Sequence, residues 1–367
     1  MIGRLGRDVR RSGGDWLSRL ERAVHIREVT GSNPVSPTTP ASPARSGSRL
    51  AIASALIAVL AGCAVAPAPA GSPTPVPGTP AATRSGSPTI TPAGSASTPG
   101  RSPAVGIPDF GHIFVIVMEN EESRSIIGNA AAPYLNSLAR SYGLATNDTA
   151  IGHPSEPNYI ALVAGSPSGV TDDGNHDLAA PNLFDQVEAS GRTWQVAAQN
   201  YPGGCYLRSS ASGGPDGPGT YVRKHNPAIS FVSISRDPAR CARIGNFHGF
   251  DPAGASFSWI EPNLCNTMHD CSIGTGDAWL ASFLPAILAS AAYRQDGLVL
   301  LTFDEGSTSI GGGGKVATIV ISPLGRAGFV SNVAHDHYSL LRTIQVAWGL
   351  PCLAHSCQAN DLVEFFR

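Results

Sequence analysis

Long apolar runs and amphipathic stretches alternate through the second two-thirds of the chain. Residues 112–118 and 298–303 are apolar at successive positions, as in strands that are buried on both faces of a sheet. Further strands are predicted at 193–198 and 317–322. Stretches with helical spacing lie between the strands, at 132–142, 182–191, 277–290 and 339–348. This alternation predicts a single α/β domain over residues 109–367 with a mainly parallel sheet.

A short apolar segment with a basic flank precedes that domain. The run of small and apolar residues within 45–63 is typical of an export signal. Its end, Leu60-Ala-Gly-Cys63, resembles a bacterial lipobox, in which the cysteine receives a lipid. The alternative is an uncleaved membrane anchor, and in either case we expect the domain outside the cytoplasm, lipid-anchored to the membrane or secreted. Residues 1–44 lack apolar periodicity, so we expect a spurious or disordered extension.

A proline-rich stretch separates the signal from the domain. Residues 64–108 contain 11 prolines, no aromatic residue and only Arg84 and Arg101 as charges. Such a composition buries too little apolar surface to offset the entropy lost on ordering. We therefore expect a disordered tether.

Charge is distributed unevenly along the chain. The formal net charge is −2, but residues 1–63 contain nine arginines and four acids, so the remaining residues carry −7. Nucleic-acid phosphates attract Lys and Arg, so a domain this acidic is a poor nucleic-acid binder. It can still bind an anionic substrate if a metal ion supplies positive charge locally.

Six of the seven cysteines lie in the predicted domain. An even number in an exported domain indicates disulfide bonds, and the alternative is a set of separate buried thiols. No Cys-x-x-Cys pair suggests a zinc or redox site. The short spacings favour the pairs Cys265–Cys271 and Cys352–Cys357, which leaves Cys205 with Cys241.

Acidic residues directly follow two of the buried strands. Glu119-Asn120 ends one apolar run, and Asp304-Glu305 ends another. Ligands of open α/β sheets bind beyond the carboxyl ends of the strands, where two acidic pairs would repel each other unless a cation lay between them. Oxygen donors of this kind suit Mg²⁺, Ca²⁺ or Mn²⁺ and tolerate Zn²⁺. Two solvated turns are the alternative interpretation.

Ser155 lies just before Pro157, and an apolar, helix-like run follows. A hydroxyl at a helix N-terminus faces backbone N–H groups and the positive end of the helix dipole, which favour an alkoxide or a bound phosphate. A metal ion at the oxygen would lower the pKa of the hydroxyl. The residue pattern alone leaves open whether Ser155 is a nucleophile or a helix cap.

The motif around Ser155 resembles the nucleophile segment of the alkaline phosphatase superfamily. Ser155-Glu-Pro-Asn-Tyr159 is followed by Leu162-Val-Ala-Gly165, and the resemblance continues at 117–120, 262–270, 302–306 and 337–344. Together these segments are similar to the bacterial phosphoesterase family of acid phosphatases and phospholipases C. The resemblance implies an alkaline-phosphatase-like core with helices on both faces of the sheet. It also implies Ser155 as the nucleophile, and a metal ion held by Glu119, Asn120, Asp304, Glu305 and Ser155.

Histidines and asparagines are the candidates for the rest of the site. His225, His269 and His337 are candidates to bind phosphate oxygens or to protonate the leaving group, although a single histidine is often structural. Asn120 and Asn158 are the predicted substrate-binding amides.

The predicted function is an exported, metal-dependent phosphomonoesterase of the acid phosphatase type, with a phosphoseryl intermediate on Ser155. A phospholipase C-type phosphodiesterase and a non-catalytic surface-binding lipoprotein are the alternatives. A serine hydrolase is disfavoured because the chain has no Gly-x-Ser-x-Gly segment, and a sulfatase because Tyr159 replaces the expected arginine. The expected partners are a small phosphate ester or a phospholipid and a membrane reached through the lipid anchor, and we expect a monomer.

Overall fold

A computed structural model describes residues 106–366 of the chain. The predictions for residues 1–44, for the signal segment 45–63 with Cys63, and for nearly all of the tether 64–108 lie outside the described residues. Within the described part, no helix is both long enough and apolar enough to cross a membrane.

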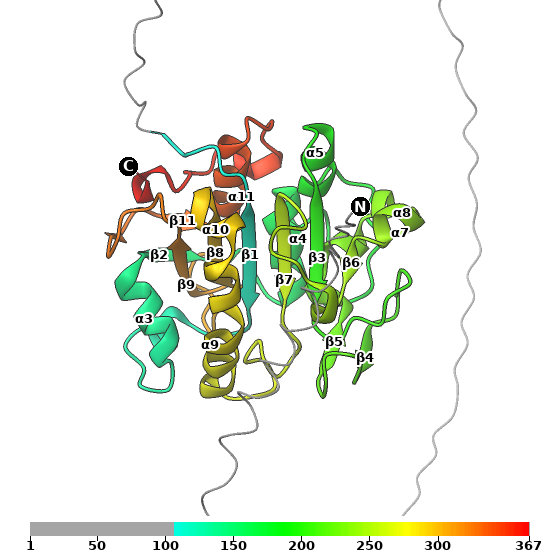
Figure 1. The fold of residues 1–367 in the computed structure, drawn as a ribbon, viewed down its shortest axis with the longest axis horizontal. Helices are drawn as coiled ribbons and strands as arrows, with labels where there is room; N and C mark the ends of the chain where they lie inside the picture. The colour runs from blue at the N-terminus through cyan, green and yellow to red at the C-terminus, as the bar shows by residue number, and fades with distance from the viewer. Residues whose placement is uncertain (1–105, 367) are drawn as a thin grey trace, which may run out of the picture. The chain divides into compact units, whose positions relative to one another are not determined.

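A nine-stranded sheet forms the centre of the fold (Figure 1), in the order β10-β2-β9-β8-β1-β7-β3-β6, with β11 also paired to β2. Strands β8, β1, β7, β3 and β6 run parallel, whereas β9 runs antiparallel to both β8 and β2. The mainly parallel sheet predicted from the sequence is therefore confirmed. Its strands are β1 (Ile113–Met118), β2 (Gly143–Thr149), β3 (Trp194–Ala198), β6 (Ile244–Gly245), β7 (Phe257–Glu261), β8 (Leu298–Phe303), β9 (Lys315–Ile321), β10 (Val330–Ser331) and β11 (His335–Asp336).

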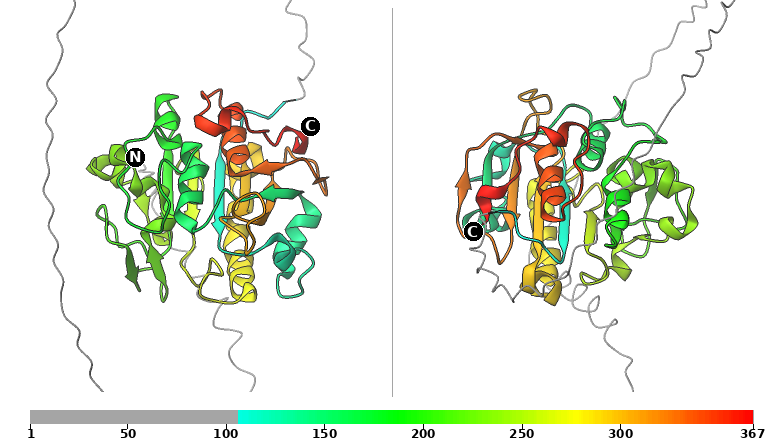
Figure 2. Two further views of the ribbon diagram at one scale, coloured as in Figure 1. Left: turned by 180° about the vertical axis from the view of Figure 1, so that it is seen from behind. Right: turned by 90° about the horizontal axis from the view of Figure 1, so that it is seen from above.

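Helices cover both faces of the sheet, and alternate side chains of β1 show the two layers. Ile113, Val115 and Val117 belong to a core that includes residues of α4, α5 and α11. Phe114, Ile116 and Met118 belong to a second core with α3, α9 and α10. This pattern explains why β1 is apolar at every position, and Figure 2 shows the reverse side of the sheet. The longer helices are α3 (Pro133–Ser141), α4 (Ser155–Ala164), α5 (Leu183–Ala189), α9 (Ile273–Ala289), α10 (Ala291–Asp296) and α11 (His337–Ala347).

Short elements fill the connections, above all between β3 and β7. They include a separate two-stranded antiparallel sheet, β4-β5. Their bounds are α2 (Ser123–Ile126), β4 (Ser210–Ser212), β5 (Thr220–Val222), α6 (Pro227–Ser230), α7 (Val232–Ser235), α8 (Pro238–Cys241) and the 3-10 helices Arg223–His225, Phe247–Gly249, Ala354–Cys357 and Val363–Phe365.

Three disulfide bonds join the six cysteines of the domain. They are Cys205–Cys241, Cys265–Cys271 and Cys352–Cys357, the pairs that the spacing favoured. The first links the loop after β3 to α8, so it closes the longest connection of the three.

Candidate active site

The two predicted acidic pairs lie next to each other at the carboxyl edge of the sheet. Strands β1 and β8 are parallel neighbours, with Met118 opposite Phe303, so the residues that follow them share one edge. Glu119 and Asp304 are fully buried. Helix α4 begins at the same edge, and its first residue, Ser155, is 2% exposed.

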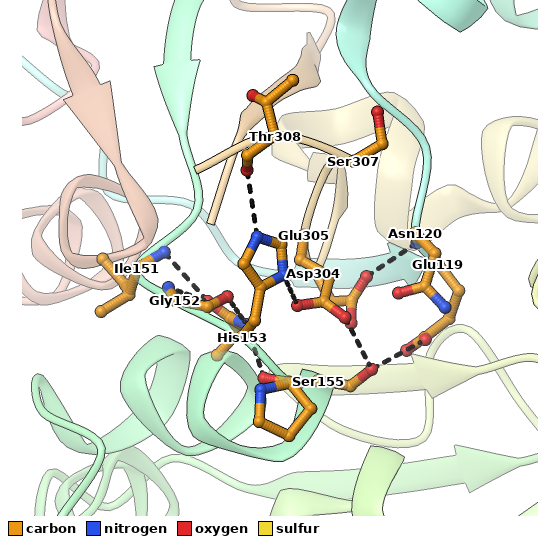
Figure 3. A network of polar contacts seen from close by, with 12 residues as sticks. Glu119, Asn120, Ile151, Gly152, His153, Ser155, Asp304, Glu305, Ser307 and Thr308 are labelled. Atoms are coloured by element: carbon orange, nitrogen blue, oxygen red, sulfur yellow. Dashed lines mark hydrogen bonds and ion pairs between the residues drawn. The ribbon is translucent and has the colours of Figure 1, made fainter. Parts of the chain in front are cut away.

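Ser155 lies between the two acidic pairs (Figure 3). Its hydroxyl donates to Glu119 Oε2 at 3.2 Å, with Glu305 Oε1 at 3.4 Å as the alternative acceptor. Asn120 has a left-handed backbone conformation, with φ of 59°, and its N–H donates to Asp304 Oδ1 at 3.0 Å. The structure thus brings together all five residues predicted to hold the metal ion.

The electrostatics of this edge call for a positive charge. Burial, together with the negative charges of Glu119 and Glu305, raises the pKa of Asp304 well above its usual range. Burial also raises the pKa of Glu305. Two buried oxygens, Asn120 Oδ1 and Asp304 Oδ2, have no hydrogen-bond partner among the described residues. Without a cation, protons must therefore remain on part of this cluster.

The donor set fits a hard divalent cation by its chemistry. Three carboxylates, one amide oxygen and one hydroxyl are the oxygen ligands that such ions take, and the two unpartnered oxygens would be satisfied by one. In the part of the chain that the structure describes, no three His, Cys, Asp or Glu side chains are grouped closely enough to hold an ion as they stand. Binding would therefore have to draw the carboxylates closer together.

Glu119 also contacts two side chains from the interior of the domain. The Tyr159 hydroxyl donates to Glu119 Oε1, and His225 Nε2 lies 3.0 Å from the same oxygen. Tyr159 and His225 are both buried and stack with their ring centroids 4.9 Å apart. Tyr159 follows Ser155 by one helical turn, so α4 supplies two of the hydroxyls that donate to Glu119, one to each carboxylate oxygen.

The three candidate histidines occupy different positions. His225 contacts Glu119, as described, and His269 lies beside it, with ring centroids 6.1 Å apart. His337 is fully buried, and its Nε2 donates to the backbone carbonyl of Asp304 at 2.5 Å. This contact links His337 to the residue that follows β8, and a catalytic role for His337 stays a prediction.

His153 contacts the site more directly than the sequence suggested. Its Nδ1 lies 2.5 Å from Glu305 Oε2, and its Nε2 lies 3.0 Å from the carbonyl oxygen of Thr308. Although partial burial opposes it, these two acceptors raise the pKa of His153. A protonated imidazole would donate from both ring nitrogens in this geometry and would place a positive charge next to Glu305.

Asn158 has a different role from the substrate contact predicted for it. Its Oδ1 accepts the N–H groups of Ile151 and Gly152 at 2.9 and 3.1 Å. Its Nδ2 donates to the carbonyls of Gly152 and Pro154. All donors and acceptors of this buried amide are used, so Asn158 fixes the loop before Ser155, and the substrate-binding assignment is corrected.

Lys224 is a cation near the site that was not among the predicted site residues. Its Nζ donates to Asp173 Oδ2 at 2.8 Å, and Asp173 Oδ1 accepts the N–H of Glu156 at 3.0 Å. Although burial opposes it, Asp173 and then Glu119 raise the pKa of Lys224. Lys224 is one of two lysines in the chain and precedes His225, a signal that was visible in the sequence.

Glu261 adds a further acid at the end of β7. It is 2% exposed, and burial together with Glu119 raises its pKa well above the usual range. It ends the apolar stretch 257–260 just as Glu119 ends β1, and this pattern could have identified it.

Comparisons with known proteins identify the family of the chain. Residues 125–351 match the model of the Phosphoesterase family. A phosphatidylinositol-3-phosphatase of Mycobacterium tuberculosis is 32% identical over 269 residues, which cover 72% of this chain and 85% of that protein. A probable acid phosphatase of Kluyveromyces lactis is 32% identical over 264 residues, which cover 69% of this chain and 62% of that protein.

The similarity to the fungal relatives covers only part of their length, and the similarity to solved structures is distant. The chain spans 57–62% of the length of the fungal acid phosphatases that it matches. Among solved structures, a lipoteichoic acid synthase, LtaP, of Listeria monocytogenes gives a TM-score of 0.49 at 10% identity, covering 72% of this chain and 78% of that one. A protein of the alkaline phosphatase superfamily from Vibrio parahaemolyticus gives 0.45 at 11% identity, covering 72% and 71%.

Proposed function

This chain belongs to the Phosphoesterase family and is a hydrolase of phosphate esters, and from that premise we propose that it is a metal-dependent phosphomonoesterase with Ser155 as its nucleophile. The observation that carries the proposal is the position of the Ser155 hydroxyl, 3.2 Å from Glu119 and 3.4 Å from Glu305 at the N-terminus of α4. Several relatives bear the name acid phosphatase, which favours phosphomonoesters as substrates.

The carboxylates around Ser155 prepare the hydroxyl for attack. Either neighbouring carboxylate can accept the hydroxyl proton as the oxygen forms its bond to phosphorus. The oxygens of Glu119, Asn120, Asp304, Glu305 and Ser155 would hold one divalent cation, which supplies charge neutralisation and a lower pKa for the hydroxyl when bound.

Lys224 and His269 are the donors that we assign to the substrate. Lys224 binds one of its non-bridging oxygens, since this half-buried ammonium is fixed by Asp173 beside the first turn of α4. As the Ser155 Oγ–phosphorus bond forms, the bond from phosphorus to the ester oxygen breaks and the alcohol leaves with a proton. His269, which is partly exposed and lies beside His225, is the donor that we assign to that proton.

Water completes the cycle. Its oxygen bonds to phosphorus, the Ser155 Oγ–phosphorus bond breaks, and Ser155 regains a proton as inorganic phosphate is released. The intermediate is a phosphoserine, which an acid quench can trap.

Matched phosphomonoesters and phosphodiesters, assayed after chelation and after addition of Mg²⁺, Ca²⁺, Mn²⁺ or Zn²⁺, test this proposal. We expect phosphomonoester hydrolysis that is lost on chelation and restored by at least one ion. Ser155→Ala should lower kcat/KM by about 10³-fold or more, and phosphate should be found on Ser155 of the wild type by mass spectrometry after the quench. Retained activity in Ser155→Ala would refute the assignment of Ser155 as the nucleophile. Faster turnover of the phosphodiesters would favour a phospholipase C-type activity. Activity that does not change on chelation would refute the proposed metal dependence.

Export and a lipid anchor on Cys63 are part of the proposal and depend on the segment 45–63. Expression of the full chain in a bacterial host, followed by mass spectrometry of the mature N-terminus, should find Cys63 as a lipidated first residue. An unprocessed segment in the membrane fraction would instead indicate an uncleaved anchor.

A further inference from the structure

A pocket of about 400 Å³ lies next to the active site and has no part in the mechanism above. Its walls continue the two strand ends that carry the acidic pairs: one follows Glu119-Asn120 into α2, and the other follows Asp304-Glu305 into the loop before β9. The lining residues are Glu122, Ser123, Arg124, Ile127, Thr146, Thr308, Ile310 and Lys315. A larger cavity of about 620 Å³ lies against α5, away from these strand ends, and is not involved.

Two of the lining residues are cations without a carboxylate partner. Arg124 is exposed and has no ion-pair partner among residues 106–366. Lys315 Nζ donates only to the amide oxygen of Asn147, at 3.1 Å. In a domain with more acids than bases, two cations left unneutralised in one pocket are available to an anionic ligand.

Glu122, the acid in the lining, accepts hydrogen bonds mainly from backbone N–H groups. Its Oε2 accepts the N–H groups of Ser307 and Thr308 at 3.0 and 3.2 Å. Its Oε1 accepts the N–H of Lys315 at 3.1 Å and the hydroxyl of Thr308 at 3.2 Å. This carboxylate therefore ties both ends of the glycine-rich loop to α2, and it does not turn toward either cation.

Two side chains, His153 and Glu305, connect this pocket to the active site. Thr308 lines the pocket, and its carbonyl oxygen is 3.0 Å from His153 Nε2. The other nitrogen of the same ring is 2.5 Å from Glu305, which contacts Ser155. Figure 3 shows His153 between Ser155 and Thr308, so the pocket lies beside the site that contains the nucleophile.

We propose that this pocket, which we call the Arg124–Lys315 subsite, binds a second phosphate of the substrate while the first phosphate lies at Ser155. This inference rests on the proposed function, and it names the substrate class as phosphomonoesters that carry a second phosphate group. The two cations and the hydroxyl of Ser123 supply the donors that a phosphate group takes.

Binding to the catalytically inactive Ser155→Ala protein tests the subsite separately from turnover. The matched ligands are inositol 3-phosphate and inositol 1,3-bisphosphate, measured by calorimetry with Mg²⁺ present. Arg124→Ala combined with Lys315→Ala should weaken the bisphosphate about tenfold and the monophosphate less than about twofold, and the tenfold loss should shrink at high salt. Arg140→Ala, which removes an exposed arginine on α3, is the matched control and should change neither affinity.

Equal weakening of both ligands, or no weakening of either, would overturn the subsite. Phosphatidylcholine vesicles containing phosphatidylinositol 3-phosphate distinguish a lipid headgroup from a soluble ester. If vesicle binding depends on the two cations and soluble bisphosphate binding does not, they contact the membrane surface and the subsite is refuted. Because these are affinities of an inactive protein, they stand even if the wild type hydrolyses none of the esters assayed under the proposed function.

Discussion

At the scale of single residues, Glu119 is the centre of the site. One of its oxygens faces Ser155, and the other receives Tyr159 and His225. A fully buried carboxylate is stable only when donors or cations surround it. Contacts that do not touch the substrate therefore control where the reacting hydroxyl and any bound metal ion lie.

Tyr159→Phe tests this control. The substitution removes one donor to Glu119 and keeps the ring that stacks on His225. We expect the metal concentration for half-maximal activity to rise by about tenfold, with most of kcat recovered at saturating metal. Tyr293→Phe, a buried tyrosine in the other core, is the control and should leave the midpoint in place. An equal loss of kcat at all metal concentrations would contradict the positioning role.

Lys224→Met tests the phosphate contact. Loss of the ammonium should weaken competitive inhibition by inorganic phosphate and raise KM, each by about tenfold, because a charge-assisted hydrogen bond is lost. Lys224→Arg should restore part of both values, since the guanidinium keeps the charge and can still pair with Asp173. A fall in kcat with an unchanged phosphate inhibition constant would show that Lys224 only supports the fold.

At the scale of secondary-structure elements, β2 differs from the apolar strands β1 and β8 in having many polar residues. Its sequence, Gly143–Thr149, is largely polar, yet it lies between β9 and the short strands β10 and β11. Asp148 is fully buried and pairs in register with His335, which is held by Glu364 at 2.7 Å. Burial raises the pKa of Asp148 to about 6, with His335 opposing and Asp336 adding to the shift.

Asp148→Asn should remove a pH dependence of stability. The folded-state pKa is above that of the unfolded chain, so this group contributes stability below about pH 4 that is lost as pH rises through about 6. Relative to the wild type, the variant should gain about 3 kcal/mol in unfolding free energy between pH 3.5 and pH 7. Urea unfolding at a series of pH values measures the gain. A difference that stays constant with pH would show that Asp148 titrates normally.

At the scale of the whole domain, disulfide bonds fasten the long connection between β3 and β7 and two short loops. The bonded cysteines are 36 residues apart in Cys205–Cys241 but only 5 apart in Cys352–Cys357. A crosslink that closes a longer loop removes more conformational entropy from the unfolded chain. The connection between β3 and β7 carries Lys224 and His225, so its anchoring also bears on the site.

Paired serine substitutions should show this order of stabilities. Replacing Cys205 and Cys241 should cost about 4 kcal/mol of unfolding free energy, and replacing Cys352 and Cys357 about 2 kcal/mol. Guanidinium unfolding of the two variants and of the wild type measures the costs. Equal costs would mean that native packing, and not loop length, sets the contribution of each bond.

The fold was predictable where its signal is local. The apolar strands β1 and β8, the helices α3, α5, α9 and α11, and the three disulfide pairs agree with the sequence prediction. Strand β2 was not predicted, because tertiary contacts bury its polar residues and the residue pattern of the strand does not show those contacts. Strand β7 was not predicted, because its apolar residues are few, Ser258 interrupts them, and the strand ends in Glu261.

The sequence by itself determined which residues end the apolar strands, and hence that acids gather at one edge of a parallel sheet. It also determined that a hydroxyl begins α4, because both facts depend only on neighbours in the chain. Tertiary structure alone decided that β1 and β8 are adjacent and that His153, and not His337, faces Glu305. It alone decided that Asp173 fixes Lys224 and that Asn158 is consumed by its own loop. These contacts join segments distant in the chain or depend on the exact path of a loop, so the pattern of residues along the chain cannot predict them.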